Sequence, residues 1–183
     1  LIIVILISIL EWLKLGKNLF IKIIGVIFLF ISFLTIFKLR HYSSHEYLEI
    51  FFILTICIST DVGGYVFGNL FKGPKLTKIS PNKTYSGVLG SFLFALVLIY
   101  FFSEFFNFQN FINNNYQLYF IVILLSAISQ IGDLIVSYFK RINNVKDTGK
   151  IIPGHGGILD RIDGMIFCFP FYYFLFYLNL TKF

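Results

Sequence analysis

Long apolar segments, separated by short polar stretches, dominate this chain. Helical periodicity cannot assign them, because a helix that is apolar all round has no distinct face. We therefore use length, since about 20 helical residues cross an apolar layer of about 30 Å. Inside a bilayer each segment must satisfy its own backbone groups, which predicts helices. The predicted spans are residues 1–14 (incomplete), 19–38, 47–70, 87–103, 117–139 and 158–180.

Composition agrees with a membrane protein. Hydrophobic residues make up 57% of the chain and charged residues only 13%, and a soluble domain has no need of 25 phenylalanines. The sequence therefore predicts an all-α fold, a polytopic transmembrane bundle with about six spans. The chain opens inside an apolar run and Met165 is its single methionine. We therefore expect the natural start, with one or more spans, to lie upstream.

The cations orient the predicted spans. Most of them fall in loops on one common side, which the positive-inside rule predicts to be cytoplasmic. They explain the net charge of +6 through topology and anionic headgroups, so nucleic acid is not an expected partner. The opposite side carries Lys38 and Arg40. The cations of the common side are Lys14, Lys17, Lys22, Lys72, Lys75, Lys78, Lys83, Lys140, Arg141, Lys146 and Lys150.

Four aspartates, Asp61, Asp133, Asp160 and Asp163, lie inside or at the ends of apolar spans. A charged side chain there costs about 2.5–3.5 kcal/mol on insertion scales, so such residues usually have a function. Purely structural pairing with a cation such as Arg161 is the alternative for any one of them. Four together favour a shared site.

Spacing places these carboxylates on facing helices. Asp160 and Asp163 share one helix face, and Asp133, Ser137 and Lys140 share another, because residues three and four apart are neighbours on a helix. Asp133 lies about 10 Å inside Lys140, at about 1.5 Å per residue. A site at this shallow depth suits a lipid phosphate better than an ion pathway, whose carboxylates would lie near the middle of the membrane.

Two polar islands on the same predicted side suit phosphates. In residues 137–163, a PGHGG turn directs backbone amides and a helix N-terminus towards an anion that Lys146 and His155 would attract. His155 could be a general acid, a phosphate donor or a loop histidine bonded to backbone. The second island, residues 60–87, contains Asp61 and a basic SPNKT turn, and a plain positive-inside loop with a helix cap is its alternative explanation.

The C-terminal island closely resembles the signature of the phosphatidate cytidylyltransferase (CDP-diacylglycerol synthase) family, SxxKRxxxxKDxGxxxPGHGGxxDRxD. The resemblance covers about residues 60–180, and Glu11 and Trp12 add a weak echo upstream. The matching signature positions are Ser137, Lys140, Arg141, Lys146, Asp147, Gly149, Pro153, His155, Gly156, Gly157, Asp160, Arg161 and Asp163. Further matches are Gly132, Asp133, Leu134, Asp61, Gly64, Tyr65, Phe67, Gly68, Ser80, Pro81, Lys83 and Thr84.

The resemblance implies transfer of CMP from CTP to phosphatidic acid, giving CDP-diacylglycerol and pyrophosphate, with Mg²⁺ required, with or without a second cation. It implies a multi-pass protein of the cytoplasmic membrane with its site on the cytoplasmic side; a homodimer is one arrangement considered. We accordingly divide the chain into N-terminal spans, residues 1–59, and a catalytic transmembrane domain, residues 60–183.

Shared depth, facing geometry and the family's metal site together predict that Asp133 and Asp160 hold the metal. Asp163 is a further ligand or orienting group. We predict catalytic roles for Asp133, Asp160, Asp163, Lys146 and His155. Substrate or phosphate binding is predicted for Asp61, Ser80, Lys83, Thr84, Ser137, Lys140, Arg141, Asp147, Gly156, Gly157 and Arg161. The sequence does not divide the cations between the triphosphate and the lipid phosphate.

Two positions depart from the family pattern: Val136 replaces the usual glutamate, and Ser86 replaces a larger polar residue. A CTP-dependent lipid kinase of the polyprenol or phytol type is the alternative enzyme, because it would use similar cationic loops. A non-enzymatic membrane transporter would explain the buried carboxylates but not the PGHGG turn.

Overall fold

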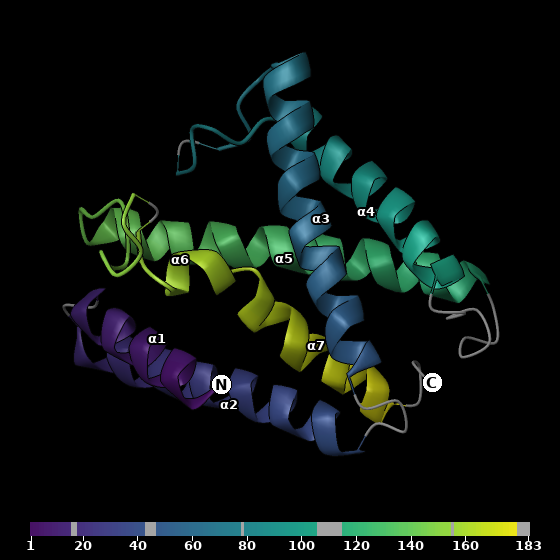
Figure 1. Cartoon of the computed structure of the whole chain (residues 1–183). Helices are drawn as coiled ribbons and strands as arrows, with labels where there is room; N and C mark the ends of the chain where they lie inside the picture. Colours follow the sequence, from purple (N-terminus) through teal and green to yellow (C-terminus); the bar gives the residue numbers. More distant parts are fainter. Residues whose placement is uncertain (16–17, 43–46, 78, 106–114, 155, 179–183) are drawn as a thin grey trace.

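The chain folds into helices joined by short loops, as Figure 1 shows. The computed structural model describes residues 1–15, 18–42, 47–77, 79–105, 115–154 and 156–178. Within these ranges β pairing is limited to two isolated bridges, which confirms the all-α prediction. The helices are α1 (Ile2–Leu15), α2 (Leu19–Tyr42), α3 (Leu48–Phe71), α4 (Tyr85–Phe105), α5 (Asn115–Ile142), α6 (Leu159–Ile162) and α7 (Met165–Tyr177).

Four of these helices, α2 to α5, are long and apolar enough to cross a membrane. They match four predicted spans, and α1 matches the incomplete first one. The last predicted span, residues 158–180, is instead divided into α6 and the shorter α7, which contains Pro170. Gly164 lies at the division, where a Cβ would be only 3.0 Å from the Ser129 carbonyl oxygen. Close packing on α5 therefore fixes the point where the two short helices meet.

Two apolar clusters hold the bundle together, and α5 contributes to both. Leu125 of α5 packs with α3 and α7 residues such as Phe52 and Tyr172 in one cluster. Val136, three turns further along α5, packs with Trp12 and Ile166 in the other. Burial of large apolar side chains on two sides therefore fixes α5, and with it the position of Asp133.

Helices α3 and α4 lie side by side (Figure 1) at a very close approach. A Cβ at Gly63 would lie 2.6 Å from the Phe94 Cβ and 2.8 Å from the Gly90 carbonyl oxygen, so only glycine fits. Small residues allow helix backbones to approach in this way within a membrane. The contact holds the second half of α3, which carries Asp61, against the start of α4, which Thr84 immediately precedes.

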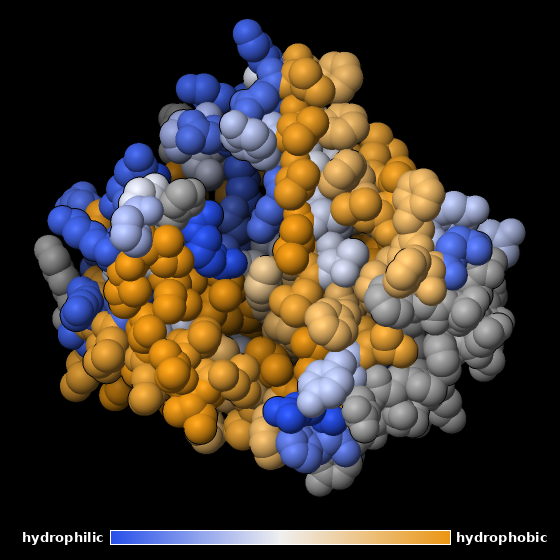
Figure 2. All heavy atoms as spheres, viewed as in Figure 1, coloured by the Kyte–Doolittle hydropathy of each residue, from blue (hydrophilic) through white to orange (hydrophobic). Residues whose placement is uncertain are grey.

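The two polar islands lie on the same side of the bundle. Figure 2 shows hydrophilic side chains gathered at the upper left, with a hollow between them, while apolar side chains cover most of the rest of this face. The Arg141 guanidinium at the end of α5 donates to the Ile79 carbonyl oxygen over 3.3 Å, which joins the two islands directly. Lys17 and Lys78 lie outside the described residues. The predicted division at residue 60 falls inside α3, which is continuous.

Candidate functional site

A pocket of about 500 Å³ lies between α3, the start of α4, α5 and α6. We call it the carboxylate pocket, because all four aspartates singled out in the sequence line it. Thr60, Ser91 and Gln130 extend it into the spanning helices. The sequence-predicted site residues that line it are Asp61, Ser80, Lys83, Thr84, Asp133, Asp160, Arg161 and Asp163.

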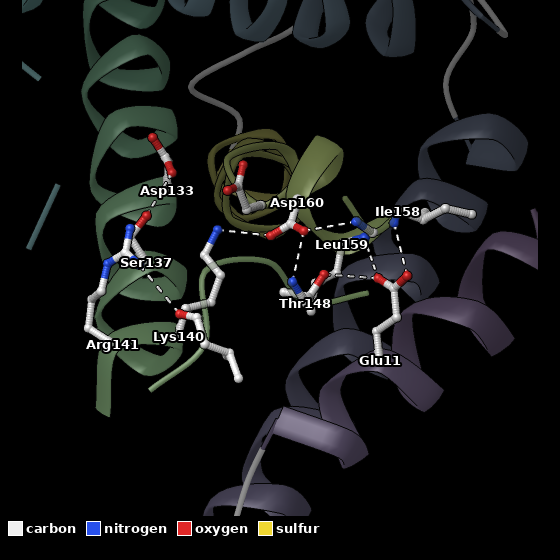
Figure 3. Close-up of polar contacts among 12 residues, drawn as sticks. Glu11, Asp133, Ser137, Lys140, Arg141, Thr148, Ile158, Leu159 and Asp160 are labelled. Carbon is white, nitrogen blue, oxygen red and sulfur yellow. Dashed lines mark hydrogen bonds and ion pairs between the residues drawn. The ribbon is translucent and has the colours of Figure 1, made fainter. Parts of the chain in front are cut away.

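Asp133 forms the wall of this pocket on α5. One carboxylate oxygen, Oδ2, lies 2.5 Å from the ammonium of Lys83, and the other accepts a hydrogen bond of 3.2 Å from the Ser137 hydroxyl (Figure 3). Asp163 lines the same pocket, and its Oδ1 accepts a hydrogen bond of 2.9 Å from the Gly164 N–H. The ion pair with Lys83 joins the polar island of residues 60–87 to α5.

Asp160 forms the opposite wall, at the first turn of α6. Its Oδ1 lies 2.8 Å from the ammonium of Lys140, which is itself buried. Its Oδ2 accepts hydrogen bonds from the backbone N–H groups of Thr148 and Gly157, at 2.8 and 2.9 Å (Figure 3). Burial raises the pKa of the Asp160 carboxyl, but Lys140 and the two amides more than offset this, so the pKa is lowered and the group stays charged.

A second pocket, of about 410 Å³, lies within the loop between α5 and α6. We call it the loop pocket. Lys146, Lys150 and Arg161 supply three cationic side chains to its lining, and Asp147 is also part of it. Gly156 adopts a φ of +85°, which an L side chain rarely adopts, and a Cβ there would lie 2.8 Å from Asp160 Oδ2. Arg161 lines this pocket as well as the carboxylate pocket.

The amides of the PGHGG turn have partners that the sequence did not predict. We expected them to face a bound anion, but the Gly157 N–H donates to Asp160, and the N–H groups of Ile158 and Leu159 donate to Glu11. Carboxylates of the chain itself therefore satisfy these amides. His155, which the sequence places with them, lies outside the described residues.

Glu11 and Thr148 are the residues of the site that sequence reasoning missed. Glu11 was recognised only as a weak match to the family pattern, and Thr148 stands at a variable position of the signature. Glu11 is a carboxylate inside an apolar run, which is the same signal that identified the four aspartates. Thr148 carries no such signal, because its partner Glu11 lies 137 residues away in sequence.

The two carboxylates predicted to hold a metal, Asp133 and Asp160, each already face a cation, the ammonium of Lys83 or Lys140. Mg²⁺ is commonly held by one or two carboxylates together with substrate phosphates and water, and the carboxylates of this pocket are ligands of that kind. In the described ranges no three His, Cys, Asp or Glu side chains form a preformed metal cluster. The residues present therefore fit a magnesium ion whose remaining ligands come from substrate phosphate and water. Magnesium binding stays a prediction.

Val136 points away from the carboxylates, although it is next to Ser137. It is 2% exposed and lines a wholly apolar pocket with Trp12 and Phe167. We expect Val136→Glu to destabilise the protein, because an unpaired buried carboxylate costs several kcal/mol. The measurement is the temperature at which detergent-solubilised protein loses its monodisperse size-exclusion peak, with Val136→Leu as the apolar control. An unchanged midpoint together with faster turnover would show that glutamate is accommodated there.

Comparison with known proteins shows the family of the chain. The sequence matches the cytidylyltransferase family over residues 1–179. A phosphatidate cytidylyltransferase of Haemophilus influenzae is 40% identical over 147 residues, which cover 76% of this chain and 51% of the relative. One of Bacillus subtilis is 38% identical over 154 residues, covering 83% and 56%, and one of Rickettsia conorii 44% over 120 residues, covering 62% and 52%. The chain spans about half the length of these curated relatives. With a match along nearly its whole length, the chain belongs to the cytidylyltransferase family.

Proposed function

We propose that this protein is a CTP:phosphatidate cytidylyltransferase, which makes CDP-diacylglycerol for phospholipid synthesis. The observation that carries the proposal is the carboxylate pocket, where Lys83 and Arg161 join four aspartates at the polar end of spanning helices. The names of the relatives support the same activity. A pocket of this kind combines cations for phosphate with carboxylates for a metal at the depth of lipid headgroups.

The proposed reaction needs no nucleophile from the protein. An oxygen of the lipid phosphate attacks the α-phosphorus of CTP, a new P–O–P bond forms, and the bond between the α-phosphorus and the bridging oxygen breaks to release pyrophosphate. Catalysis then consists of alignment and stabilisation of negative charge. The protein contributes Lys and Arg side chains to both, as phosphoryl-transfer sites generally do.

The two pockets suggest how the cations are divided between the substrates. The carboxylate pocket reaches Thr60 and Ser91 inside the spans, so the lipid phosphate can enter it from the bilayer. The loop pocket is lined only by residues 146–161, outside the four candidate spans, so water-soluble CTP can reach it. We therefore assign Lys83 to the lipid phosphate and Lys146 and Lys150 to the triphosphate.

Arg161 has a special place in this proposal, because it lines both pockets. The two substrates must meet at the α-phosphorus, and a guanidinium can bind two phosphates at once through its several N–H groups. Asp133 and Asp160 would hold Mg²⁺, with Asp163 beside Asp133, and a bound Mg²⁺ would neutralise charge on the triphosphate. Binding of a second cation beside Mg²⁺ stays a prediction.

We also propose that the protein lies in the cytoplasmic membrane with the site facing the cytoplasm. The support is the grouping of cationic loops on the side of the site, which the positive-inside rule associates with the cytoplasm. A homodimer stays a prediction.

The position of a label tests the function directly. The protein is reconstituted into vesicles that contain phosphatidic acid and is given Mg²⁺ and CTP labelled at the α-phosphate. We expect the label to enter the lipid while unlabelled pyrophosphate appears in equal amount, because the CMP group is the part transferred. The lipid product is separated by extraction and identified by its mass.

Other outcomes would overturn the proposal. Label that stays in CDP, with lipid phosphorylated from the γ-position, would identify a CTP-dependent lipid kinase. Failure to release pyrophosphate with any lipid phosphate would favour a transporter. Vesicles with diacylglycerol in place of phosphatidic acid are the control, since they lack the attacking phosphate.

A further inference from the structure

Helix α1 reaches the site through one buried carboxylate, that of Glu11. Its side chain is 2% exposed and accepts hydrogen bonds from the Thr148 hydroxyl at 3.1 Å and from the N–H groups of Ile158 and Leu159 at 3.1 and 2.8 Å (Figure 3). These three donors come from the loop and from the start of α6. A buried charge is costly unless it is bonded, so these contacts hold the loop firmly to α1.

Two glycines of the loop leave the space that this carboxylate occupies. A Cβ added at Gly149 or at Gly157 would collide with the Glu11 carboxylate oxygens. Neither glycine has a positive φ, so backbone strain does not explain them. The space that they leave is filled by Glu11, and this gives a physical reason for two of the glycines in the signature.

Glu11 and Asp160 bind the same loop from two sides. Thr148 donates its hydroxyl to Glu11 and its N–H to Asp160, and Gly157 donates its N–H to Asp160 while the next two residues donate to Glu11. Residues 148–157 are therefore tied at both ends. This segment and its flanks carry Lys146, Lys150 and Arg161, the cations of the loop pocket.

We propose that Glu11 is a positioning residue, which holds the loop pocket in a fixed place beside the carboxylate pocket. It touches no substrate and acts through the loop, so its effect on the reaction rests on the proposed function. The consequence is that α1 sets how well the loop cations bind the triphosphate. Losing this support should weaken CTP binding more than it slows the chemical step, because Asp133 lies on α5 and its partner Lys83 lies in the turn before α4, and neither belongs to the loop that Glu11 binds.

Glu11→Gln is the sharpest test, because it changes charge and hydrogen bonding but hardly changes volume. One Glu11 oxygen faces the Ile158 N–H and the other faces the Leu159 N–H. A glutamine must therefore point its NH₂ group at one of these donors, whichever way its amide is turned. We expect the KM for CTP to rise about tenfold, a loss of about 1.4 kcal/mol in binding, with kcat and the KM for phosphatidic acid changed much less.

Matched variants separate positioning from general destabilisation. Thr148→Val removes only the hydroxyl contact and should raise the KM for CTP by a smaller factor, while Thr148→Ser restores it. The double variant Glu11→Gln with Thr148→Val should be less than additive, since the two residues share one contact. Ser8→Ala is the control on α1, because Ser8 is equally buried but donates to the Val4 carbonyl oxygen of its own helix. It should leave both KM values unchanged.

Hydrogen–deuterium exchange tests the contact without any substrate. We expect Glu11→Gln to speed amide exchange in the peptide that contains residues 157–159 and to leave exchange in α3 and α4 unchanged. If wild-type protein makes no CDP-diacylglycerol, the proposed function fails, while exchange still tests the role of Glu11 in the loop. A wild-type KM for CTP in an active Glu11→Gln variant, or wild-type exchange at the loop, would overturn the proposal. If Glu11→Gln cannot be purified folded, the Thr148 pair carries the same test.

Discussion

Replacing Asp133 with asparagine is expected to lower CDP-diacylglycerol formation about a thousandfold while the protein stays folded. The asparagine has the same shape and can still accept a hydrogen bond from the Ser137 hydroxyl, which now lies 3.2 Å from Oδ1. It lacks the charge that holds the Lys83 ammonium 2.5 Å away and that would bind magnesium. The measurement is the initial rate in vesicles over a wide range of Mg²⁺ concentration.

Ser137→Ala is the matched control for this prediction. It removes the hydrogen bond to Asp133 but leaves the carboxylate and its ion pair with Lys83 in place. We expect only a several-fold loss of rate, because a hydrogen bond to a charged group contributes about 1.5–3 kcal/mol and water can replace part of it. If Asp133→Asn kept more than a tenth of the wild-type rate with unchanged magnesium dependence, Asp133 would not be a metal ligand.

Local spacing predicted a large part of this site. Asp133, Ser137 and Lys140 were placed on one helix face from their separation alone, and the structure bonds Ser137 to Asp133 and directs Lys140 to the facing Asp160. The reason is that helix geometry fixes the relation between residues three and four apart, whatever the rest of the fold does. Lys83 was predicted to bind a substrate phosphate, and its ion pair with Asp133 is a contact that the spacing within one helix could not predict.

The division of the last span could not be predicted in the same way. Residues 158–180 are apolar along most of their length, and such a sequence favours one long helix. The break between α6 and α7 depends on how Gly164 packs on Ser129, a contact between residues far apart in the chain. Length and hydropathy contain no information about that contact, so the prediction gave one helix where the structure has two.

The partners of the PGHGG amides differ from the prediction for a related reason. Amides at a helix N-terminus indicate an anion, but they do not say whether that anion is a ligand or a side chain. Here it is the carboxylate of Glu11, which reaches them from α1 across the fold. A charged residue inside an apolar run was the available signal, and applying the same rule to Glu11 as to the aspartates would have identified it.

Asp160 combines two tasks that the other aspartates do not share. Its Oδ1 holds the Lys140 ammonium at the edge of the carboxylate pocket, and its Oδ2 accepts two backbone N–H groups of the loop. Both oxygens therefore face donors or cations, and an asparagine must turn its NH₂ group towards one of them. Asp160 is therefore both a predicted metal ligand and one of the side chains that support the loop pocket.

Asp160→Asn is therefore expected to lower CDP-diacylglycerol formation about a thousandfold and also to speed amide exchange at Thr148 and Gly157, because it removes a proposed metal ligand and loosens the loop. The measurements are the rate across a magnesium titration and exchange in the loop peptides. Lys140→Met is the comparison, since it leaves the Asp160 carboxylate and its bonds to the loop amides in place. It should slow the reaction without faster loop exchange. Near-full CTP-dependent activity in a correctly inserted Asp160→Asn protein would contradict the metal prediction. Wild-type amide exchange at Thr148 and Gly157 would contradict the role of Asp160 in holding the loop.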